Sequence, residues 1–594
     1  MYQSVLHILL ETIKTYPHKT ALKFKENGQY KTLNYTTFGE KIRDLTAGLY
    51  AIGLKQGDRI AILSYNRPEW TICDFAIFAL RGIVVPLYHT LPPDQIAYIL
   101  NDAKVKAIFV ENEEQLGKIQ QIHSNCNSLK YIFTFIQNIS NKEEIITFND
   151  LIQLGKKKNQ AEPDFFNKQV NAIHPDDICS LVYTSGTTGD PKGVMLHHKG
   201  FVHDIINSEK VIQLRADDIF LSFLPLSHLY ERLAGHWCAM YKGCTIAYAE
   251  SIETVVENIQ EIQPTVLISV PRLYEKIYQG ILDKVEEAPA IRKKLFNLAL
   301  KNSIKYHEQR RKNRLKWLTQ LTYKIVDKLV FSKIREQLGG HLRYPISGGA
   351  PLAVETCKFF EAIGLPLIEG YGMTESHLII TLAPLGKSKY GSCGKPIPGI
   401  KVKIAEDGEI LVHGDTVMAG YYNKPEATKE AIDENGWLHT GDIGFLDEDN
   451  YLFITDRKKN IIVTAGGKNI APAPIENALK QSKYIEDVCL IGDRRKFLSA
   501  LIIPNFENLK EWALNNGIPV EETSWLKNDK INNIISTEIE KYQIGFARYE
   551  KVKKFIILSQ PLTIEDGSLT PSLKIKRKVV EKRFKNLIDQ LYQD

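Results

Sequence analysis

Short apolar runs alternate with amphipathic segments from Arg59 onward, and the two patterns have different periods. Continuous apolar runs predict buried strands, whereas apolar residues that recur every three or four positions predict helices. The expected elements are strands at 60–64, 83–87, 107–110, 178–183, 266–270 and 342–347 and helices at 70–81, 93–101, 272–281 and 353–363. Repeated β-α-β alternation of this kind predicts an α/β fold with mostly parallel sheets and helices on both faces.

The pattern changes after Gly399 to short strands separated by turns, at 409–413, 437–440 and 451–455. These segments predict a small β-rich subdomain at about 400–455. A charged segment follows, and an α+β pattern then continues with strands at 488–492, 498–504 and 552–558. We therefore expect a large N-terminal domain (1–455), a hinge at 456–461 that includes Asp456, and a smaller C-terminal α+β domain (462–594).

Two segments depart from the alternation. Residues 156–167 are charged and polar, which indicates a surface excursion. Residues 292–338 form a Lys/Arg-rich, helical-looking insertion in which Arg310–Trp317 is strongly basic and apolar residues recur at 315, 318, 321, 325 and 329. A basic amphipathic helix with a Trp is typical of contact with an anionic membrane surface. A solvated helical hairpin packed on the sheet is the alternative, and it is favoured because charge runs usually face water.

Composition narrows the class of protein. A chain of 594 residues is too long for one core and suggests about three to four structural units. With 44% hydrophobic and 25% charged residues it is typical of globular proteins, and a net charge of +6 does not indicate a nucleic-acid partner. Eight scattered cysteines without a C-x-x-C spacing, no secretory signal and no long apolar run favour the cytoplasm, with peripheral contact at the inner face of the membrane left open.

The segment Leu181–Val194 contains the clearest candidate chemistry. The predicted strand ends in a loop with three hydroxyls, two glycines and a lysine, which are Ser185, Thr187, Thr188, Gly186, Gly189 and Lys192. Hydroxyls donate hydrogen bonds, glycines let backbone N–H groups approach an anion, and the lysine adds positive charge. The sequence therefore predicts a polyphosphate-binding loop, although G-x-x-x-x-G-K-[ST] does not fit it in any register.

Three further segments offer ligand-binding groups at strand ends, where ligands bind in open parallel sheets. Ser347–Leu352 presents small residues and backbone donors. In Glu369–Ser376, Tyr371 could stack on a purine, Thr374 could bond a phosphate oxygen and Glu375 could hold Mg²⁺. Asp442, in an expected tight turn, could accept the hydroxyls of a ribose, and Arg457 could contact ribose or phosphate. Alone, Ser347–Leu352 is better explained as a tight strand-to-helix turn, and the Tyr371–Glu375 spacing has little meaning. A simple turn residue stays the alternative for Asp442.

Two more segments carry little information by themselves. His228, in Pro225–Arg232, lies among apolar residues and is more simply a hydrogen-bonded core residue. The basic stretch Leu569–Lys578 near the C-terminus is simply a solvated tail unless another domain supplies an anion.

In this order and spacing, the segments resemble the adenylate-forming superfamily of acyl-CoA synthetases, from about residue 10 to about residue 585. Pro225–Arg232, Ser347–Leu352 and Thr455–Pro472 resemble its long-chain fatty acid–CoA ligase branch, as does the basic insertion. The resemblance implies ATP- and Mg²⁺-dependent activation of a fatty acid to acyl-AMP, followed by transfer to coenzyme A. It implies no nucleic-acid partner, and a homodimer stays open because the sequence does not determine oligomeric state.

The resemblance also implies roles for residues. The catalytic residues would be Lys574, Thr374 and Glu375, with Glu375 as the metal ligand. ATP would be bound by Thr184, Ser185, Gly186, Thr187, Thr188, Gly189, Lys192, Gly348, Gly349, Ala350, Tyr371, Gly372, Thr374, Asp442 and Arg457. His228 would lie at the acyl site, whose wall we expect within 229–241. Gly466, Gly467 and Lys468 would admit the pantetheine arm after the C-terminal domain rotates about Asp456.

Two alternatives stay open at this point. One is an enzyme of the same superfamily with another acceptor or acid: a fatty acyl-AMP ligase, or a synthetase for a medium-chain or aromatic acid. The other is an inactive lipid-binding homologue. The second is disfavoured because the chain retains Lys574, Glu375 and the hydroxyl-rich loop.

Overall fold

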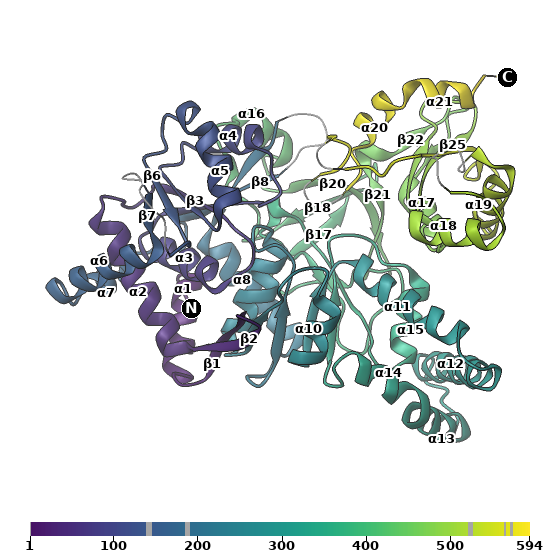
Figure 1. Ribbon diagram of the computed structural model, residues 1–594, viewed down its shortest axis with the longest axis horizontal. Helices are drawn as coiled ribbons and strands as arrows, with labels where there is room; N and C mark the ends of the chain where they lie inside the picture. The colour runs from purple at the N-terminus through teal and green to yellow at the C-terminus, as the bar shows by residue number, and fades with distance from the viewer. Residues whose placement is uncertain are drawn as a thin grey trace. The chain divides into compact units, whose positions relative to one another are not determined.

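The computed structural model describes residues 2–137, 145–184, 190–520, 527–563, 566–570 and 574–593 (Figure 1). The chain divides into two compact units. The first comprises Met1–Lys403, Leu411–His439 and Glu448–Leu452, and the second comprises Ile404–Ile410, Thr440–Asp447 and Phe453–Asp594. The hinge at 456–461 stays a prediction. Within the described residues, no helix combines the length and the apolar character needed to cross a membrane.

An eight-stranded sheet in the first unit is parallel except at one edge. In spatial order its strands are β19 (Gly420–Tyr421), β9 (Lys192–His197), β8 (Ile178–Thr184), β4 (Ile83–Leu87), β3 (Arg59–Leu63), β5 (Ala107–Val110), β6 (Tyr131–Thr134) and β7 (Ile145–Thr147). The β8–β9 and β9–β19 pairs are antiparallel, and the other pairs are parallel. The predicted strands at 83–87 and 107–110 are confirmed to the residue, because their apolar runs are buried in the core except for the half-buried Ile83.

A nine-stranded sheet in the same unit is also parallel in its central part. Its order is β16 (Lys395–Pro396), β15 (Thr381–Leu382), β14 (Ile368–Tyr371), β13 (Tyr344–Ser347), β12 (Val266–Ser269), β10 (Ile219–Ser222), β11 (Thr245–Tyr248), β1 (Thr20–Glu26) and β2 (Gln29–Asn34). The strands from β14 to β1 are parallel, and antiparallel strands close both ends. The predicted α/β class with mostly parallel sheets is confirmed.

The other strands of the described residues form three smaller sheets. The β-rich region forms a four-stranded sheet of β17 (Lys401–Ile404), β18 (Glu409–His413), β20 (Leu438–Leu446) and β21 (Leu452–Arg457). The second unit also contains the pair β22 (Ile462–Val463) and β23 (Asn469–Ile470), and the sheet β24 (Ile485–Ile491), β25 (Leu498–Pro504) and β26 (Val552–Ile557).

Helices connect and cover these strands. In the first unit they are α1 (Val5–Thr15), α2 (Tyr35–Ala51), α3 (Pro68–Ala79), α4 (Pro93–Asp102), α5 (Glu113–Ile122), α6 (Phe148–Ala161), α7 (Phe165–Asn171), α8 (His198–Ile212), α9 (Cys238–Tyr241), α10 (Val255–Ile262), α11 (Pro271–Glu286), α12 (Ala290–Arg311), α13 (Trp317–Val326), α14 (Ser332–Gln337), α15 (Val354–Ala362) and α16 (Pro425–Ala431). In the second they are α17 (Pro472–Leu479), α18 (Phe506–Asn515), α19 (Asp529–Tyr542), α20 (Arg577–Arg583) and α21 (Lys585–Leu591).

Most of the segment 156–167 is helical: residues 156–161 end α6, which packs closely on α2, and residues 165–167 begin α7. Two glycines allow this approach: a Cβ on Gly155 would lie 1.6 Å from the Asp44 carbonyl oxygen, and one on Gly48 would lie 2.0 Å from the Leu151 carbonyl oxygen. The surface excursion is therefore a helix that lies against another helix with one face and turns its lysines outward.

The insertion at 292–338 is also helical. It contains α12, α13, a π-helical turn η3 (Asp327–Phe331) and α14. Helix α12 packs on α15, where the Ser303 hydroxyl donates to the Ala362 carbonyl oxygen over 2.7 Å. Its Phe296 and Ala299 belong to the same buried core as Leu267 of strand β12.

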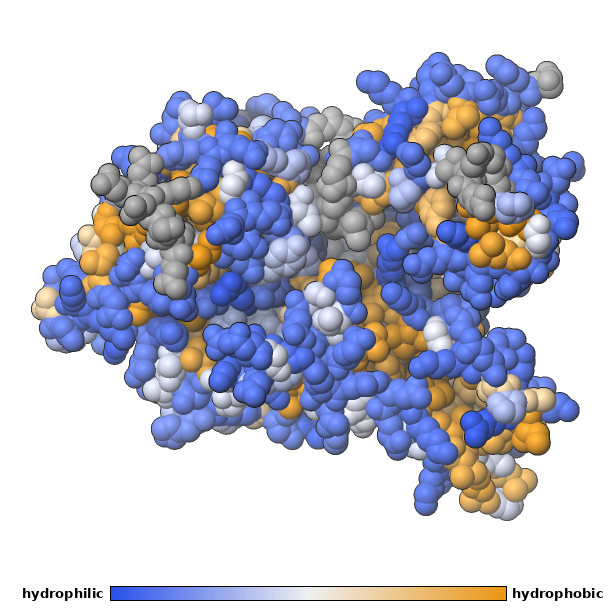
Figure 2. Space-filling model, in the orientation of Figure 1, coloured by the Kyte–Doolittle hydropathy of each residue, from blue (hydrophilic) through white to orange (hydrophobic). Residues whose placement is uncertain are grey.

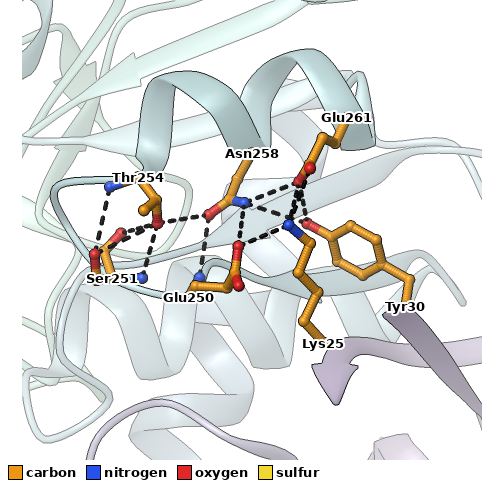
Figure 3. A network of polar contacts seen from close by, with 7 residues as sticks. All are labelled: Lys25, Tyr30, Glu250, Ser251, Thr254, Asn258 and Glu261. Carbon is orange, nitrogen blue, oxygen red and sulfur yellow. Dashed lines mark hydrogen bonds and ion pairs between the residues drawn. The ribbon is translucent and has the colours of Figure 1, made fainter. Parts of the chain in front are cut away.

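A polar network fastens the edge of the nine-stranded sheet (Figure 3). The Lys25 ammonium, on β1, lies 2.7 Å from Glu250 and 2.8 Å from Glu261, which follow β11 and lie on α10 respectively. Asn258 donates to both carboxylates, and Tyr30 on β2 donates to Glu261. Since all the charges in the network have partners, we assign it a structural role.

Candidate functional site

The predicted phosphate loop connects two antiparallel strands. Thr184, the last residue of β8, pairs with Lys192, the first residue of β9. Ser185, Gly186, Thr187, Thr188 and Gly189 lie outside the described residues, so their roles stay predictions. The pairing of β8 with β9 extends from Ile178 opposite His197 to Thr184 opposite Lys192.

Lys192 and Glu375 are joined by an aromatic side chain that the sequence did not suggest. The Lys192 ammonium lies 4.9 Å from the centre of the Tyr421 ring, and the Tyr421 hydroxyl donates to Glu375 Oε1 over 2.9 Å. Burial and the neighbouring Glu375 carboxylate raise the pKa of Tyr421 above its ordinary value, so it stays a donor. Tyr421 reaches this position because β19 pairs with β9, opposite Val194. The structure thus places a cation and a carboxylate on either side of one phenol.

The segment from Tyr371 to Glu375 turns sharply at the end of β14. Tyr371 is the last residue of that strand, and Thr374–Ser376 form a short 3-10 turn, η4. Gly372 is required here, since a Cβ at this position would lie 1.3 Å from the Leu378 carbonyl oxygen. The backbone of Glu375 is also held, because its carbonyl accepts from the N–H of Met418 over 2.9 Å.

His377 secures the far side of this turn. It has a left-handed φ of 58° and is fully buried, with its ring stacked on His197. Its Nε2 lies 3.0 Å from the His197 amide nitrogen, and its Nδ1 lies 2.6 Å from the Thr416 carbonyl oxygen. Burial and the nearby His197 lower its pKa well below the ordinary value, so the ring is neutral. A neutral histidine can accept at Nε2 and donate at Nδ1, which satisfies both contacts.

The Gly348–Ala350 loop leaves β13 and is shaped by Tyr230. A Cβ on Gly348 would lie 3.0 Å from the Tyr230 ring, whose hydroxyl lies 3.2 Å from the Ser269 carbonyl oxygen. Gly349 has a φ of +81°, which a glycine adopts without strain. The Ser347 hydroxyl is buried and has no hydrogen-bond partner in the described part of the chain. Buried hydroxyls are normally paired, so this loop has the character of a ligand-binding edge.

His228 lies at the start of the same region. It is half-buried, its Nδ1 accepts from the N–H of Tyr230 over 3.1 Å, and its ring meets Tyr88 edge-on at 6.5 Å. These contacts fit the structural interpretation and do not exclude the acyl-site role, which stays a prediction. The expected acyl wall, 229–241, contains the π-helix η2 (Tyr230–Trp237) and α9, and most of its side chains are buried.

A buried ion pair supports this region and was missed by sequence reasoning. Arg232, on η2, is fully buried; it forms a bidentate pair with Asp74 on α3, and its Nη1 donates to the Ser180 hydroxyl over 2.8 Å. Its guanidinium lies 4.8 Å from the centre of the Trp237 ring. No sequence signal identified Asp74 or Ser180, since each is a single polar residue in an apolar element. The pair connects η2 to the strand that leads into the phosphate loop.

The second unit brings three of the predicted residues together. The Arg457 Nε lies 3.1 Å from Asp442 Oδ1, and Asp442 is buried. The side chain of Lys574 is exposed, but desolvation of its ammonium by the surrounding protein lowers its pKa, the Arg457 charge lowers it further, and the Asp442 carboxylate opposes both. Asp442 does not lie in a tight turn: it is inside β20, although Gly441 before it has a φ of +69°. The turn prediction was wrong because the strand continues through the glycine.

The Thr464–Lys468 loop is the turn between β22 and β23. The Thr464 N–H donates to the Lys468 carbonyl oxygen over 3.0 Å, and Gly467 has a φ of +72°. Gly466, Gly467 and Lys468 are exposed, and a Cβ on Gly467 would meet nothing within 4 Å. Asp456 is buried and accepts from the N–H groups of Arg457 and Ala473 at 2.6 and 2.9 Å. Its role as a hinge stays a prediction.

Comparison with known proteins gives two family matches and close relatives. The AMP-binding enzyme family matches residues 9–422, and the AMP-binding enzyme C-terminal domain matches residues 459–594. The long-chain-fatty-acid–CoA ligase FadD15 of Mycobacterium bovis is 33% identical over 95% of this chain and 93% of its own length. The long-chain-fatty-acid–CoA ligase ACSBG2 of Xenopus laevis is 32% identical over 100% of this chain and 84% of its own. The fold is similar to that of the anthranilate CoA ligase AuaEII, solved with anthranoyl-AMP (TM-score 0.74, 22% identity, 99% and 98% coverage).

Proposed function

Because the chain belongs to the AMP-binding enzyme family, and is therefore an adenylate-forming, acyl-activating enzyme, we propose that it ligates a long-chain fatty acid to coenzyme A. In the first step a carboxylate oxygen of the acid attacks the α-phosphorus of ATP. The bond from that phosphorus to the pyrophosphate oxygen breaks, which gives acyl-AMP and pyrophosphate. In the second step the CoA thiolate attacks the acyl carbon, the bond to AMP breaks, and a thioester and AMP result.

The observation that carries the adenylation step is the Lys192–Tyr421–Glu375 contact at the end of the β8–β9 pair. Lys192 supplies positive charge for the β- and γ-phosphates, in a loop whose remaining hydroxyls and glycines fit the same ligand. Tyr371 would stack on the adenine, the backbone of Gly348–Ala350 and Gly372 would line its pocket, and Thr374 would bond a phosphate oxygen. These roles come from the resemblance.

The residues present fit a magnesium ion. Mg²⁺ in phosphate-transfer sites is usually held by one or two carboxylates together with substrate phosphates rather than by a cage of protein ligands. Glu375 offers such a carboxylate, and within the described residues no group of three or more His, Cys, Asp and Glu side chains could form a cage. The ion would screen the negative charge of the phosphates, and the Tyr421 hydroxyl would orient the Glu375 carboxylate that binds it.

Lys574, Asp442 and Arg457 would act together on the nucleotide. Asp442 would accept the ribose hydroxyls, and Arg457 beside it would contact ribose or phosphate. The Lys574 ammonium would lie between the attacking carboxylate and the α-phosphate, where it stabilises the charge that develops during transfer. For the thioester step we propose that the C-terminal domain (462–594) rotates about Asp456 and brings Gly466, Gly467 and Lys468 to the site. Separate arrangements suit two steps that need different groups at one carbon.

The acid and the acceptor are supported by the relatives. Those that are 31–33% identical over at least 95% of this chain are named as long-chain fatty acid–CoA ligases or long-chain acyl-CoA synthetases. His228 would then lie at the acyl site. A fatty acyl-AMP ligase and a synthetase for a medium-chain or aromatic acid are the competing activities, because a change of acid or acceptor needs few substitutions.

The test is pyrophosphate release from ATP and Mg²⁺ with palmitate, with and without CoA, for the wild-type enzyme, Lys574→Ala and Lys576→Ala. We expect turnover that needs both palmitate and CoA, with adenylation lost in Lys574→Ala. Loss of adenylation in Lys576→Ala alone would transfer the catalytic role to Lys576. A single burst that CoA does not extend would indicate a fatty acyl-AMP ligase. Activity only with octanoate or an aryl acid would change the substrate, and inactivity with every acid would support the lipid-binding homologue.

A further inference from the structure

One face of helix α13 is apolar and open to solvent. Four large apolar residues of α13 and one of the following turn η3 are 50 to 70% exposed. They are Trp317, Leu318, Leu321 and Ile325 on α13 and Leu329 on η3, and we call the surface that they form the α13 face. They recur at helical spacing, so they form one continuous stripe, and α13 itself buries no residue. Figure 2 shows the corresponding hydrophobic surface at the lower right, over the helices that Figure 1 labels α12 and α13. Isolated exposed apolar residues are ordinary, but a continuous stripe of this kind marks a contact surface.

The hairpin that carries the exposed stripe is firmly held by other contacts, so loose packing does not account for the exposure. Phe296 and Ala299 of α12 are buried in the core beside α15. On the same helix, Arg311 pairs with Glu361 at 3.0 Å. The rings of Tyr306 and Tyr323 stack at 4.0 Å and fix α13 on α12. The helices are therefore positioned by other contacts, and the α13 face stays exposed in the folded hairpin.

The surroundings of the stripe are strongly basic. Residues 290–338 contain fourteen Lys and Arg against three Asp and Glu, a net charge of +11, so the other 545 residues carry a net −5 of the total +6. Arg314, Lys316, Lys324 and Lys328 are exposed, and none of them forms an ion pair within the described part of the chain. The positive charge of this protein is thus concentrated where its apolar surface is exposed.

We propose that the α13 face binds the surface of an anionic lipid bilayer. An apolar stripe beside lysines and arginines is the combination that an interfacial helix needs: the apolar side chains enter the boundary of the acyl chains while the cations meet anionic headgroups. Trp317, at the N-terminus of α13, suits the headgroup level. A second copy of this chain is a poorer occupant, since two faces of charge +11 would repel each other. The inference is independent of the proposed function, because it concerns a surface and not the reaction.

The experiment is flotation of the full-length protein, without substrates, with vesicles of phosphatidylcholine alone or with added phosphatidylglycerol. We expect binding to the anionic vesicles and weak binding to the neutral ones. The variant Leu318→Gln/Leu321→Gln/Ile325→Gln is expected to lower the partition coefficient at least tenfold. The variant Arg314→Gln/Lys316→Gln/Lys324→Gln is expected to lower it about 100-fold, since each cation near such a surface contributes about fivefold.

Matched controls lie elsewhere on the first unit. Ile252→Gln/Val256→Gln removes two equally exposed apolar residues, and Lys156→Gln/Lys157→Gln removes two exposed lysines; both are expected to bind as wild type. Unchanged circular dichroism shows that each variant is folded. Equal binding to neutral and anionic vesicles, or equal losses in the controls, would overturn the proposal. Self-association in sedimentation velocity that the Leu318 triple variant abolishes, without vesicle binding, would overturn it in favour of a second copy.

Discussion

The buried pair between Arg232 and Asp74 provides a quantitative test of how the first unit is held together. Arg232 is fully buried and Asp74 is 1% exposed at its side chain. In Asp74→Leu the guanidinium cannot lose its proton, so it stays charged and loses two charge-assisted hydrogen bonds. Each such bond contributes about 1.5–3 kcal/mol, which agrees with the 3–5 kcal/mol expected when a buried pair loses one partner.

The reverse substitution is expected to cost less. In Arg232→Met the Asp74 carboxyl can neutralise itself by taking up a proton, and burial already raises its pKa. Because the folded protein then holds a proton that the unfolded chain releases, the stability of this variant relative to wild type falls as pH rises, by up to about 1.4 kcal/mol per unit. The double variant Asp74→Leu/Arg232→Met leaves neither charge buried and is expected within about 1–2 kcal/mol of wild type.

The assay is denaturant unfolding followed by tryptophan fluorescence, since Trp70 and Trp237 both lie against the Arg232 guanidinium. The four proteins form a double-mutant cycle with an expected coupling of at least about 3 kcal/mol. The exposed pair Lys429–Glu426, treated in the same way, should show no measurable coupling. A coupling below about 1 kcal/mol, or a double variant as unstable as the sum of the singles, would refute the reasoning.

Three further outcomes are expected. Burial raises the pKa of Glu231 to about 8, so the folded state keeps a proton that the unfolded chain releases above about pH 4.5. The free energy of unfolding of the wild type relative to Glu231→Gln should therefore fall between pH 5 and 9, and parallel stability curves would contradict this. Tyr421→Phe keeps the ring under Lys192 but loses the hydrogen bond to Glu375, so the KM for Mg-ATP should rise about tenfold. An unchanged KM would show that Tyr421 does not belong to the site. Since the pKa of Lys574 is lowered, the single-turnover rate of acyl-AMP formation should fall as pH rises, at a pH lower than the ordinary pKa of lysine. Arg457→Met should shift this fall to higher pH, and the same pH profile in both proteins would contradict the role of Arg457.

Sequence reasoning found the individual elements and many candidate residues. The strands at 83–87 and 107–110 were predicted to the residue, because a run buried on both faces is apolar throughout and ends where the core ends. The membership of the AMP-binding enzyme family was also evident, since motifs in order along the chain do not depend on knowing their contacts. Asp442 was misplaced in a turn because Thr-Gly-Asp has a local preference that the pairing of β20 overrides.

By itself, then, the sequence determined the class of fold, the order of its elements and the residue types that serve the chemistry, because these follow from local periodicity and from motifs within a few residues. Only the tertiary structure decided that Tyr421 joins Lys192 to Glu375, and that Arg232 is buried against Asp74. It also decided that the apolar stripe of α13 faces outward. Each of these depends on which distant segments pack together, and the same amphipathic pattern predicts a helix whether its apolar face is covered or left open.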